Sequence, residues 1–396
     1  MDSKASLVTA ASRKMYRAVL PRLTDMISDL LSLLAAEDSH EIIMQLILDA
    51  EDAYWQVPLH ASEQPFSCCV LNRLDSPPSY LTFVRTAQGS RGAPLAWSII
   101  FGLICRCAFS VLIAHRPFPR PDTEKLQVYV DDPSLAIRGS PPHCQKQAAL
   151  MILAWSILGV RLAFNKGQWG PSVNWIGANL TVLNRAVEVC ILQSRLDDVR
   201  SLIDAVQARN VVSLKALRTL TGKLQSIASL MYTWRPFVHM MYAALYKYED
   251  SGNCARGFCW RRQIQTPIDW IRAFLAENHG NLRRVFTVDS YLRRGVPISI
   301  TTDASPFGIG AVLEVGGSLT SFFSDSLSVL DRALLAVASP PTSADQQVLE
   351  AFAILVALRH WSPQWRGQRV RLSVLTDNVA APVSYTHLTL PTSDLV

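Results

Sequence analysis

The sequence is most constrained by residues 125–132, a short alternating run that ends in two adjacent carboxylates, Asp131 and Asp132. Successive side chains on a strand point to opposite faces, so neighbouring aspartates can serve one site only where the strand gives way to a turn. Residues 134–138 read as the returning strand, and Pro133 lacks the N–H that a strand ladder needs. The pattern predicts a β-hairpin with Pro133 in its turn. Two like charges there favour either plain solvation or a bound cation, for which Mg²⁺ is suited.

A chain of 396 residues is too long for one compact core and predicts two or three domains. The net charge of +6 is compatible with a polyanionic partner without being evidence for one, although arginine pairs stand out at 261–262, 283–284 and 293–294. The eight cysteines have no C-x-x-C spacing, so we expect reduced thiols and no zinc site. This composition indicates an intracellular protein of either the cytoplasm or the nucleus.

The N-terminus lacks the apolar core of a signal peptide, so we expect no secretion. Residues 93–114 are apolar over a length that could span a membrane, but Pro94 and Arg106 interrupt the run. We expect a buried core helix there and no contact with a membrane.

Around the carboxylate hairpin, helix and strand signals alternate. Residues 44–49 predict an apolar strand that delivers Asp49 at its end, where a carboxylate is costly without a partner. The other expected elements are two helical pieces in residues 1–48, the second starting at Pro21; a hairpin from 65–71 and 80–85; a glycine-bearing turn at 88–94; and helices at 95–114 and 143–159.

From residue 194 to 247 the apolar period becomes helical, with Ser213 as the expected N-cap of the second helix. Gly222 lies inside that helix, where glycine costs about 1 kcal/mol relative to alanine, so either a close helix crossing or a ligand contact should explain it. Further on we expect a connection with one helix near 268–277; a three-strand meander from 298–303, 309–315 and 318–324; a helix at 343–361; and a strand at 370–377.

Five segments, taken in order, carry a family resemblance: L-D-A-E-D-A-Y (48–54), Q-G-S-R-G-A-P (88–94), Y-V-D-D (129–132), Lys166 and N-W-I-G (174–177). The series resembles the palm motifs of reverse transcriptases from retroviruses, pararetroviruses and LTR- or DIRS-type retrotransposons. The resemblance covers about residues 20–250. It implies an RNA-directed DNA polymerase with an α+β fold, in which a right-hand palm of antiparallel sheet and helices is followed by a helical thumb.

The resemblance also implies a role for each motif residue. Asp49, Asp131 and Asp132 would hold two Mg²⁺ (or Mn²⁺) ions per polymerase site for in-line phosphoryl transfer. Lys166 would protonate the departing pyrophosphate. Nucleotide binding falls to Tyr54, which would lie under the sugar, and to Gln88 and Gly89; primer–template contact falls to Trp175, Ile176, Gly177, Gly222 and Lys223. The same residues also have plain structural interpretations. Tyr54 would be a core aromatic, Gln88 and Gly89 a loop before a helix, and Lys166 a solvated loop lysine. Trp175 would pack on a strand, and Gly222 would mark a helix crossing.

A second carboxylate set consists of Asp303, Glu350 and Asp377. The segments T-D-A-S-P-F-G-I-G-A-V-L (302–313) and L-T-D-N (375–378) resemble the RNase H fold, an α/β domain that cleaves RNA in an RNA–DNA hybrid by the same two-metal logic. These three residues would be its metal ligands, although Glu350 alone could be a solvated helix residue. The fourth family carboxylate has no counterpart after Asp377, so we expect an incomplete RNase H-like domain.

The predicted organisation is partial fingers and N-terminal helices (1–48), a palm with a fingers insertion (49–178), thumb-like helices (179–250), a connection (251–295), a truncated RNase H-like domain (296–383) and a tail without family resemblance (384–396). The expected partners are an RNA template, a DNA primer, an RNA–DNA hybrid and dNTP substrates; the sequence sets no oligomeric state. The rival hypotheses are an inactive retroelement remnant that only binds nucleic acid, and a membrane or purely structural helical protein. Convergence of Asp49, Asp131 and Asp132 would favour the polymerase.

Overall fold

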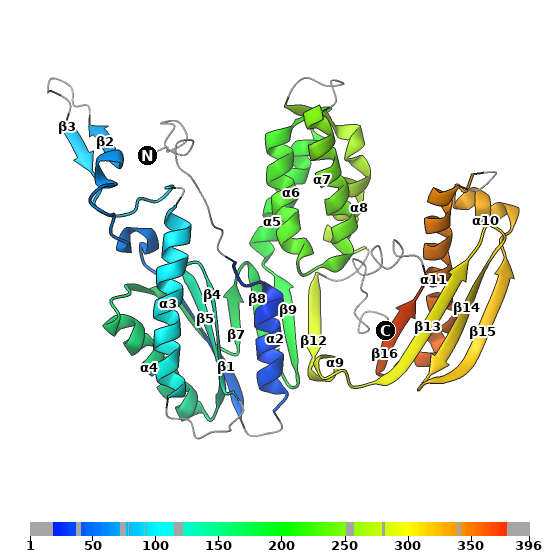
Figure 1. The fold of residues 1–396 in the computed structure, drawn as a ribbon, viewed down its shortest axis with the longest axis horizontal. Helices are drawn as coiled ribbons and strands as arrows, with labels where there is room; N and C mark the ends of the chain where they lie inside the picture. Colours follow the sequence, from blue (N-terminus) through cyan, green and yellow to red (C-terminus); the bar gives the residue numbers. More distant parts are fainter. Residues whose placement is uncertain are drawn as a thin grey trace. The chain divides into compact units, whose positions relative to one another are not determined.

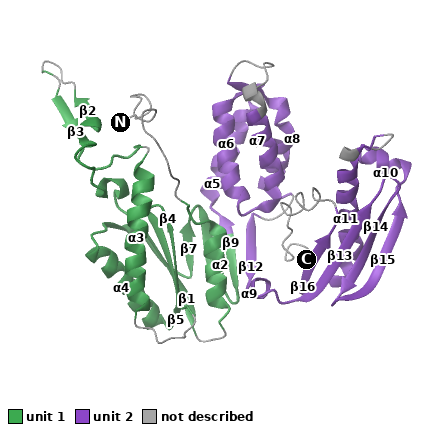
Figure 2. Cartoon of the chain, viewed as in Figure 1, with its two compact units in different colours: residues 1–189 green, residues 190–396 purple. Residues whose placement is uncertain are grey.

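The computed structural model describes residues 19–36, 41–71, 77, 79–90, 92–114, 122–250, 257–278, 282–338 and 342–377 (Figure 1). The chain forms two compact units, residues 1–189 and 190–396 (Figure 2). Its fold is mixed α+β with antiparallel sheets, which confirms the predicted fold class at that level. The six-part division of the chain stays a prediction. The first predicted helical piece and the tail 384–396 lie outside the described residues.

The first unit contains a four-stranded sheet in the order β4-β5-β1-β6, in which β5 pairs antiparallel with β4 and β1, and β1 pairs antiparallel with β6. The strands are β1 (Ile42–Ala50), β4 (Glu124–Tyr129), β5 (Asp132–Gly139) and β6 (Leu162–Gly170). The predicted strand before Asp49 and the predicted hairpin around residues 125–138 are therefore confirmed as elements.

Helices cover both faces of this sheet. Leu135 and Ile137 of β5 join the core formed with α3 (Ala93–Ile113) and α4 (Pro141–Ile157), which lie side by side in Figure 1. Ser134 and Arg138, on the opposite face of the strand, contact α2 (Leu23–Leu34) instead. Alternation along one strand thus places a helix layer on each face, and it explains why β5 is buried along nearly its whole length.

Pro133 is not in the turn, so that part of the hairpin prediction is wrong. β5 begins at Asp132, and Pro133 lies in the strand opposite Val128. An N–H at this position would point toward β1, but pairing with β1 begins only at Ser134. Proline is tolerated because it precedes the first residue that needs a ladder donor on that side.

Helix α3 is long and apolar enough to span a membrane, judged by length and composition alone. Trp97, Phe101 and Cys105 on one face are buried in the core of the first unit. On the opposite face Ile99 and Leu103 are each 63% exposed. The helix therefore has the sheet contact expected of a core helix along one side and an apolar surface along the other.

Smaller sheets complete the first unit. The predicted hairpin is present as β2 (Cys68–Leu71) and β3 (Ser79–Thr82), which pair antiparallel, and the 3₁₀ turns η1 (Ala53–Gln56) and η2 (Gln64–Phe66) precede it. After β6, β7 (Ser172–Trp175) pairs antiparallel with β8 (Ala178–Leu183), and β9 (Ala186–Ile191) lies next to β8.

The second unit begins with the helices α5 (Gln193–Gln207), α6 (Leu214–Ala228), α7 (Arg235–Asp250) and α8 (Gln265–Leu275). The Ser213 side chain accepts a hydrogen bond from the Ala216 N–H at 3.2 Å, so the predicted N-cap of α6 is confirmed. The connection is richer than predicted, because besides α8 it contains β11 (Phe258–Trp260), η4 (Arg261–Gln263), β12 (Arg283–Thr287) and α9 (Val288–Tyr291). Strand β11 pairs antiparallel with β10 (Val211–Ser213). The 3₁₀ turn η3 (Tyr232–Trp234) precedes α7.

The second unit ends in a sheet of order β15-β14-β13-β16. The predicted meander is β13 (Val296–Ala304), β14 (Gly308–Val315) and β15 (Ser318–Ser326); α10 (Val329–Leu334) and α11 (Ser343–Trp365) follow, and then β16 (Val370–Leu375). Helix α11 packs on the sheet through Trp361, which is buried with Ile300 and Leu313. Because β16 runs parallel to β13, the C-terminal ends of these two strands meet at one edge.

Two glycines of the second unit offer a matched test of this packing. A Cβ at Gly308 would lie 2.5 Å from the Asp325 carbonyl oxygen, whereas a Cβ at Gly222 would meet nothing within 4 Å. We expect Gly308→Ala to lower the free energy of unfolding by about 1–3 kcal/mol through overpacking. Gly222→Ala should raise it by about 1 kcal/mol through helix propensity. Urea unfolding followed by circular dichroism measures both, and equal effects of the two substitutions would contradict the packing described.

Candidate active site

The two aspartates predicted to bind metal lie at the tip of the β4–β5 hairpin. Tyr129 pairs with Asp132, so Val130 and Asp131 form a two-residue loop. Val130 has φ 55°, a left-handed conformation that β-branched residues rarely adopt and that glycine usually supplies in such loops. The tip is therefore held in a strained shape by its surroundings.

Three donors from three different elements hold this tip. The backbone carbonyls of residues 130–132 accept hydrogen bonds, in order, from the Trp97 indole at 2.9 Å, the Ala50 N–H at 3.0 Å and the Trp175 indole at 3.1 Å. Trp97 comes from α3, Ala50 from the end of β1 and Trp175 from β7. Each carbonyl of the loop is thus fixed to a separate part of the fold, which orients the two carboxylates.

Trp175 has a supporting contact that the sequence did not indicate. Its side chain is 2% exposed, and its ring meets Tyr129 edge-on with centroids 6.5 Å apart. Ile176 and Gly177 follow with φ 46° and 79° and make the turn from β7 to β8. The primer contact predicted for residues 175–177 stays a prediction, and the half-buried turn is the part able to make it.

Asp49 lies next to this hairpin and forms an ion pair with Lys166. The register between β1 and β6 shifts between Ile47 and Asp49, and such a bulge re-aims the side chains beside it. Lys166 lies within β6, so the reading of it as a loop lysine is wrong. The carboxylate of Asp49 raises the pKa of the exposed Lys166 ammonium, which therefore stays protonated and supplies the partner that a strand-end carboxylate needs.

The charge of Asp49 acts on both aspartates of the hairpin tip. Burial is the main cause that raises the pKa of Asp132, to about 6, and the charges of Asp131 and Asp49 raise it further while Lys166 lowers it. Burial likewise raises the pKa of Asp131, with a further contribution from Asp49. Carboxylates that are half-buried and repel one another form a site that a divalent cation would stabilise, and their oxygens are the ligands Mg²⁺ prefers.

Two predicted nucleotide-binding positions differ in how they relate to the aspartates. Tyr54 is half-buried in η1, and burial, followed by the charge of Asp131, raises the pKa of its hydroxyl. Gln88 and Gly89 are exposed in a turn closed by the Ser90 N–H on the Ala87 carbonyl at 3.1 Å, where Gly89 has φ 91°. Their role in nucleotide binding stays a prediction.

On α6, the predicted duplex contacts Gly222 and Lys223 are both exposed. The open space around a Cβ at Gly222 argues against a close helix crossing as the reason for the glycine. Lys223 donates to Asp198 of α5 at 2.6 Å, so its charge is already partnered. The sequence missed Arg195, an exposed guanidinium that donates to Ser226 at 3.0 Å, one helical turn beyond Gly222.

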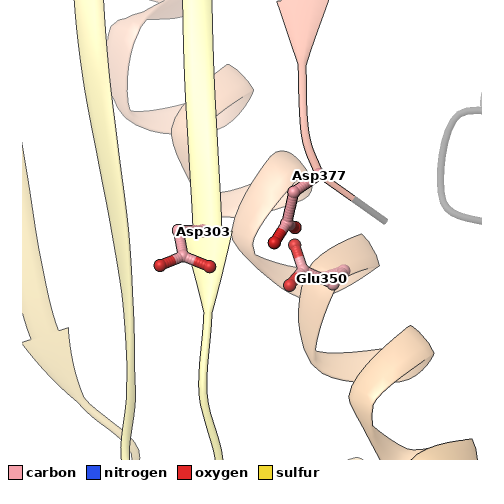
Figure 3. A group of neighbouring side chains, drawn as sticks. All are labelled: Asp303, Glu350 and Asp377. Atoms are coloured by element: carbon pink, nitrogen blue, oxygen red, sulfur yellow. The ribbon is translucent and has the colours of Figure 1, made fainter. Parts of the chain in front are cut away.

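The second predicted carboxylate set is brought together closely. One oxygen from each of Asp303, Glu350 and Asp377 lies within 4.8 Å of the others, and Figure 3 shows Glu350 and Asp377 turned toward each other beside Asp303. Thr301 of β13 pairs with Leu375 of the parallel strand β16. Asp303 lies two residues after Thr301, and Asp377 lies two residues after Leu375. Parallel register therefore explains why residues 74 positions apart meet at one edge.

Glu350 is 1% exposed, so the alternative of a solvated helix residue is wrong. Its two carboxylate oxygens accept hydrogen bonds from the Gln346 amide at 3.0 Å and the Thr376 hydroxyl at 3.1 Å. Gln346 also donates to the Ala304 carbonyl at 2.6 Å, next to Asp303. These two supporting residues were missed, although Gln346 lies one helical turn before Glu350 and Thr376 directly precedes Asp377. Three hard oxygen ligands held in this way fit a divalent cation.

No protein-family model matches this chain, and no curated protein matches it. Among solved structures, it is similar to a foamy viral protease-reverse transcriptase in complex with double-stranded DNA, at 12% identity and TM-score 0.46, over 98% of this chain and 57% of that one. A foamy viral protease-reverse transcriptase in complex with RNA/DNA hybrid is similar at 14% identity and TM-score 0.44, over 100% and 45%. The chain spans about half the length of these two proteins.

A third structure, a foamy viral protease-reverse transcriptase in complex with dsDNA, is similar at 13% identity and TM-score 0.42, over 98% of this chain and 67% of that one. Both candidate carboxylate sites are therefore inferred from the geometry of this chain and not from these similar structures.

The raised pKa of Asp132 predicts a pH-dependent stability. Its folded-state pKa of about 6 lies above the ordinary 3.8, so its contribution to stability is full below about pH 4 and is lost as the pH rises through about 6. Asp132→Asn should therefore stabilise the chain at pH 7.5, by about 1 kcal/mol once partial exposure is allowed for, and change little at pH 4. Urea unfolding at both pH values measures this. Asp52→Asn, at an exposed position nearby, is the control, and an equal gain for Asp132→Asn at both pH values would contradict the assignment.

Proposed function

We propose that the first unit is the catalytic part of an RNA-directed DNA polymerase that joins dNTPs to a primer end by two-metal phosphoryl transfer. The observation that carries this proposal is the meeting of Asp49 with the distant hairpin residues Asp131 and Asp132. The Ala50 N–H, next to Asp49, donates to the Asp131 carbonyl, and the charge of Asp49 raises the pKa of both hairpin aspartates. A surface turn of solvated aspartates would be neither half-buried nor anchored through all of its carbonyls. The order of the surrounding sequence motifs supports the same conclusion.

Each residue near the aspartates then has a chemical task. Asp49, Asp131 and Asp132 would hold two Mg²⁺ (or Mn²⁺) ions, which when bound activate the attacking 3′-oxygen and neutralise the charge that develops on the phosphates. Lys166 orients Asp49 through their ion pair and, being protonated, is able to give a proton to pyrophosphate. Tyr54 follows Asp49 by five residues, and its bulky ring would exclude a 2′-hydroxyl.

The helices of the second unit fit the role of a thumb that contacts the primer–template duplex. Gly222 leaves open space on the exposed face of α6, so the backbone of a nucleic acid can approach the helix there. Arg195, beside that face, carries a charge that the described residues pair only with the neutral Ser226 hydroxyl. We therefore favour Arg195 over the ion-paired Lys223 as the phosphate contact.

A second activity, hydrolysis of RNA in an RNA–DNA hybrid, is favoured by the close grouping of Asp303, Glu350 and Asp377. With Mg²⁺ these carboxylates would position water for attack on a phosphodiester. The predicted RNase H-like region runs to residue 383, and its last residues, 378–383, lie outside the described part of the chain. The partners of the whole protein would be an RNA template, a DNA primer and their hybrid, at an intracellular location, as for a retroelement polyprotein.

The polymerase proposal predicts Mg²⁺-dependent extension of a DNA primer on an RNA template. Asp131→Asn removes one of the charges required to hold metal and should lower the extension rate by at least about 100-fold. Asp52→Asn should leave it unchanged. Labelled-primer extension resolved by gel electrophoresis measures the rate, and equal extension by the wild type and Asp131→Asn would exclude the proposed site.

The nuclease proposal predicts Mg²⁺-dependent cleavage of the RNA strand of a hybrid, which Asp303→Asn should abolish and Asp131→Asn should spare. Conversely, the Asp303→Asn variant should keep the primer-extension activity. A labelled hybrid of RNA and DNA serves as substrate, with an exposed carboxylate of the same sheet changed in Asp325→Asn as control. If both activities were absent while salt-dependent hybrid binding persisted, the chain would be the inactive, nucleic-acid-binding remnant.

A further inference from the structure

Neither proposed activity uses the three arginine pairs in the sequence. In all three pairs at least one arginine has a partner inside the fold, and for Arg261 this is the Gln207 carbonyl. Arg284 donates to the Leu230 carbonyl at 2.9 Å, and Arg294 lies 3.8 Å from the Asp289 carboxylate. The remaining pair, Arg261-Arg262, lines a pocket on the second unit, and that pocket lies outside both proposed catalytic centres.

This pocket has a volume of about 720 Å³ and is lined by Asn210, Trp260, Arg261, Arg262 and Gln265. Among the described residues, the lining has two cationic side chains, two amides and an aromatic ring, and no acidic side chain. Trp260 is 38% exposed, so its ring is accessible to a ligand. The lining is thus suited to an anion that carries a flat group.

Backbone hydrogen bonds fix the walls of the pocket. Trp260 pairs with Val211 across the β10–β11 ladder, and the Arg261 N–H donates to the Asn210 carbonyl at 3.0 Å. The Arg261 guanidinium donates to the Gln207 carbonyl at the end of α5, at 2.7 Å. Because these bonds already order the chain from 260 to 261, a ligand would bind without ordering a loop first.

Arg262 differs from Arg261 in having its guanidinium beside the ring of the pocket. Its guanidinium carbon lies 5.9 Å from the centre of the Trp260 ring, within the range of a cation–π contact. In the described ranges no carboxylate pairs with Arg262, which is exposed. Gln265, at the start of α8, is the lining residue with an acidic neighbour, since its amide donates to Asp269 at 2.8 Å. Arg262 is therefore the cation available to an external anion.

We propose that this pocket binds one nucleotide unit, with its base stacked on Trp260 and its phosphate paired with Arg262. An aromatic face beside a guanidinium is the combination with which proteins hold single-stranded nucleic acids, because every base has a face to stack and every nucleotide has a phosphate. The bases of a duplex are already stacked on one another, so a duplex offers no free base face to stack on the Trp260 ring. A single strand and a free nucleotide both carry such a unit and share this chemistry.

Photo-crosslinking tests the proposal directly. A deoxythymidine oligonucleotide of about 12 nucleotides, within the range of known single-strand sites, carries one 5-iodouracil and is irradiated with the full chain. Peptide mapping should find the crosslink on Trp260, and Trp260→Ala should abolish it. Trp270→Ala is the matched control, because Trp270 is similarly exposed at 42% but does not line the pocket.

A second variant pair tests the phosphate contact while the crosslinking ring is kept. Arg262→Ala should lower the yield at Trp260 by about threefold or more and make it less sensitive to salt. Arg272→Ala, an exposed arginine of α8 outside the pocket, should not. A 5-iodouracil deoxynucleoside triphosphate used alone distinguishes the sources, since labelling by it identifies a free-nucleotide site and labelling by the oligonucleotide alone identifies a single-strand site.

The proposal is overturned if the crosslink maps away from Trp260, or if both arginine variants change the yield equally. Asp131→Asn and Asp303→Asn should crosslink like the wild type, because the pocket shares no residue with either carboxylate set. Failure of the polymerase or nuclease proposal is therefore distinguishable from failure of this one.

Discussion

The arrangement of the first unit depends on holding the β4–β5 hairpin tip against the end of β1. Asp49, Asp131 and Asp132 repel one another there, and repulsion alone would swing the tip into solvent. Three hydrogen bonds to successive carbonyls oppose this movement, each stabilising by about 1 kcal/mol, and two of them come from buried indoles that need an acceptor. The hairpin position thus follows from contacts to backbone carbonyls, which do not occupy the carboxylates of Asp131 and Asp132.

The negative charge of the two carboxylate sets is compensated in different ways. In the first, Lys166 neutralises Asp49 while Asp131 and Asp132 have raised pKa values, so a divalent cation would compete with a lysine and a proton. In the second, the neutral donors Gln346 and Thr376 orient Glu350. A cation there would meet ligand oxygens already gathered within 4.8 Å, because the parallel register of β13 and β16 sets their spacing.

Patterns with a short period were predictable from the residues themselves, whereas the grouping of distant carboxylates was expected only through the family resemblance. The hairpin of β4 and β5, the meander of β13 to β15 and the cap at Ser213 follow from local alternation and local hydrogen bonding. Pro133 was misplaced because its tolerance depends on where β1 begins to pair. The alternative of a loop lysine at Lys166 was wrong because β6 extends to Gly170, and this extension is set by pairing with β1.

Tryptophan shows most clearly why residue type alone does not assign a role. Trp97 and Trp175 are each 2% exposed, and both use the indole N–H on a loop carbonyl, so their rings serve as rigid supports. Trp260 leaves its ring accessible beside a guanidinium that the described residues do not neutralise. An indole combines an apolar ring with one donor, and burial decides which of the two is offered. A buried tryptophan therefore positions other groups, whereas an exposed one beside a cation is free to bind.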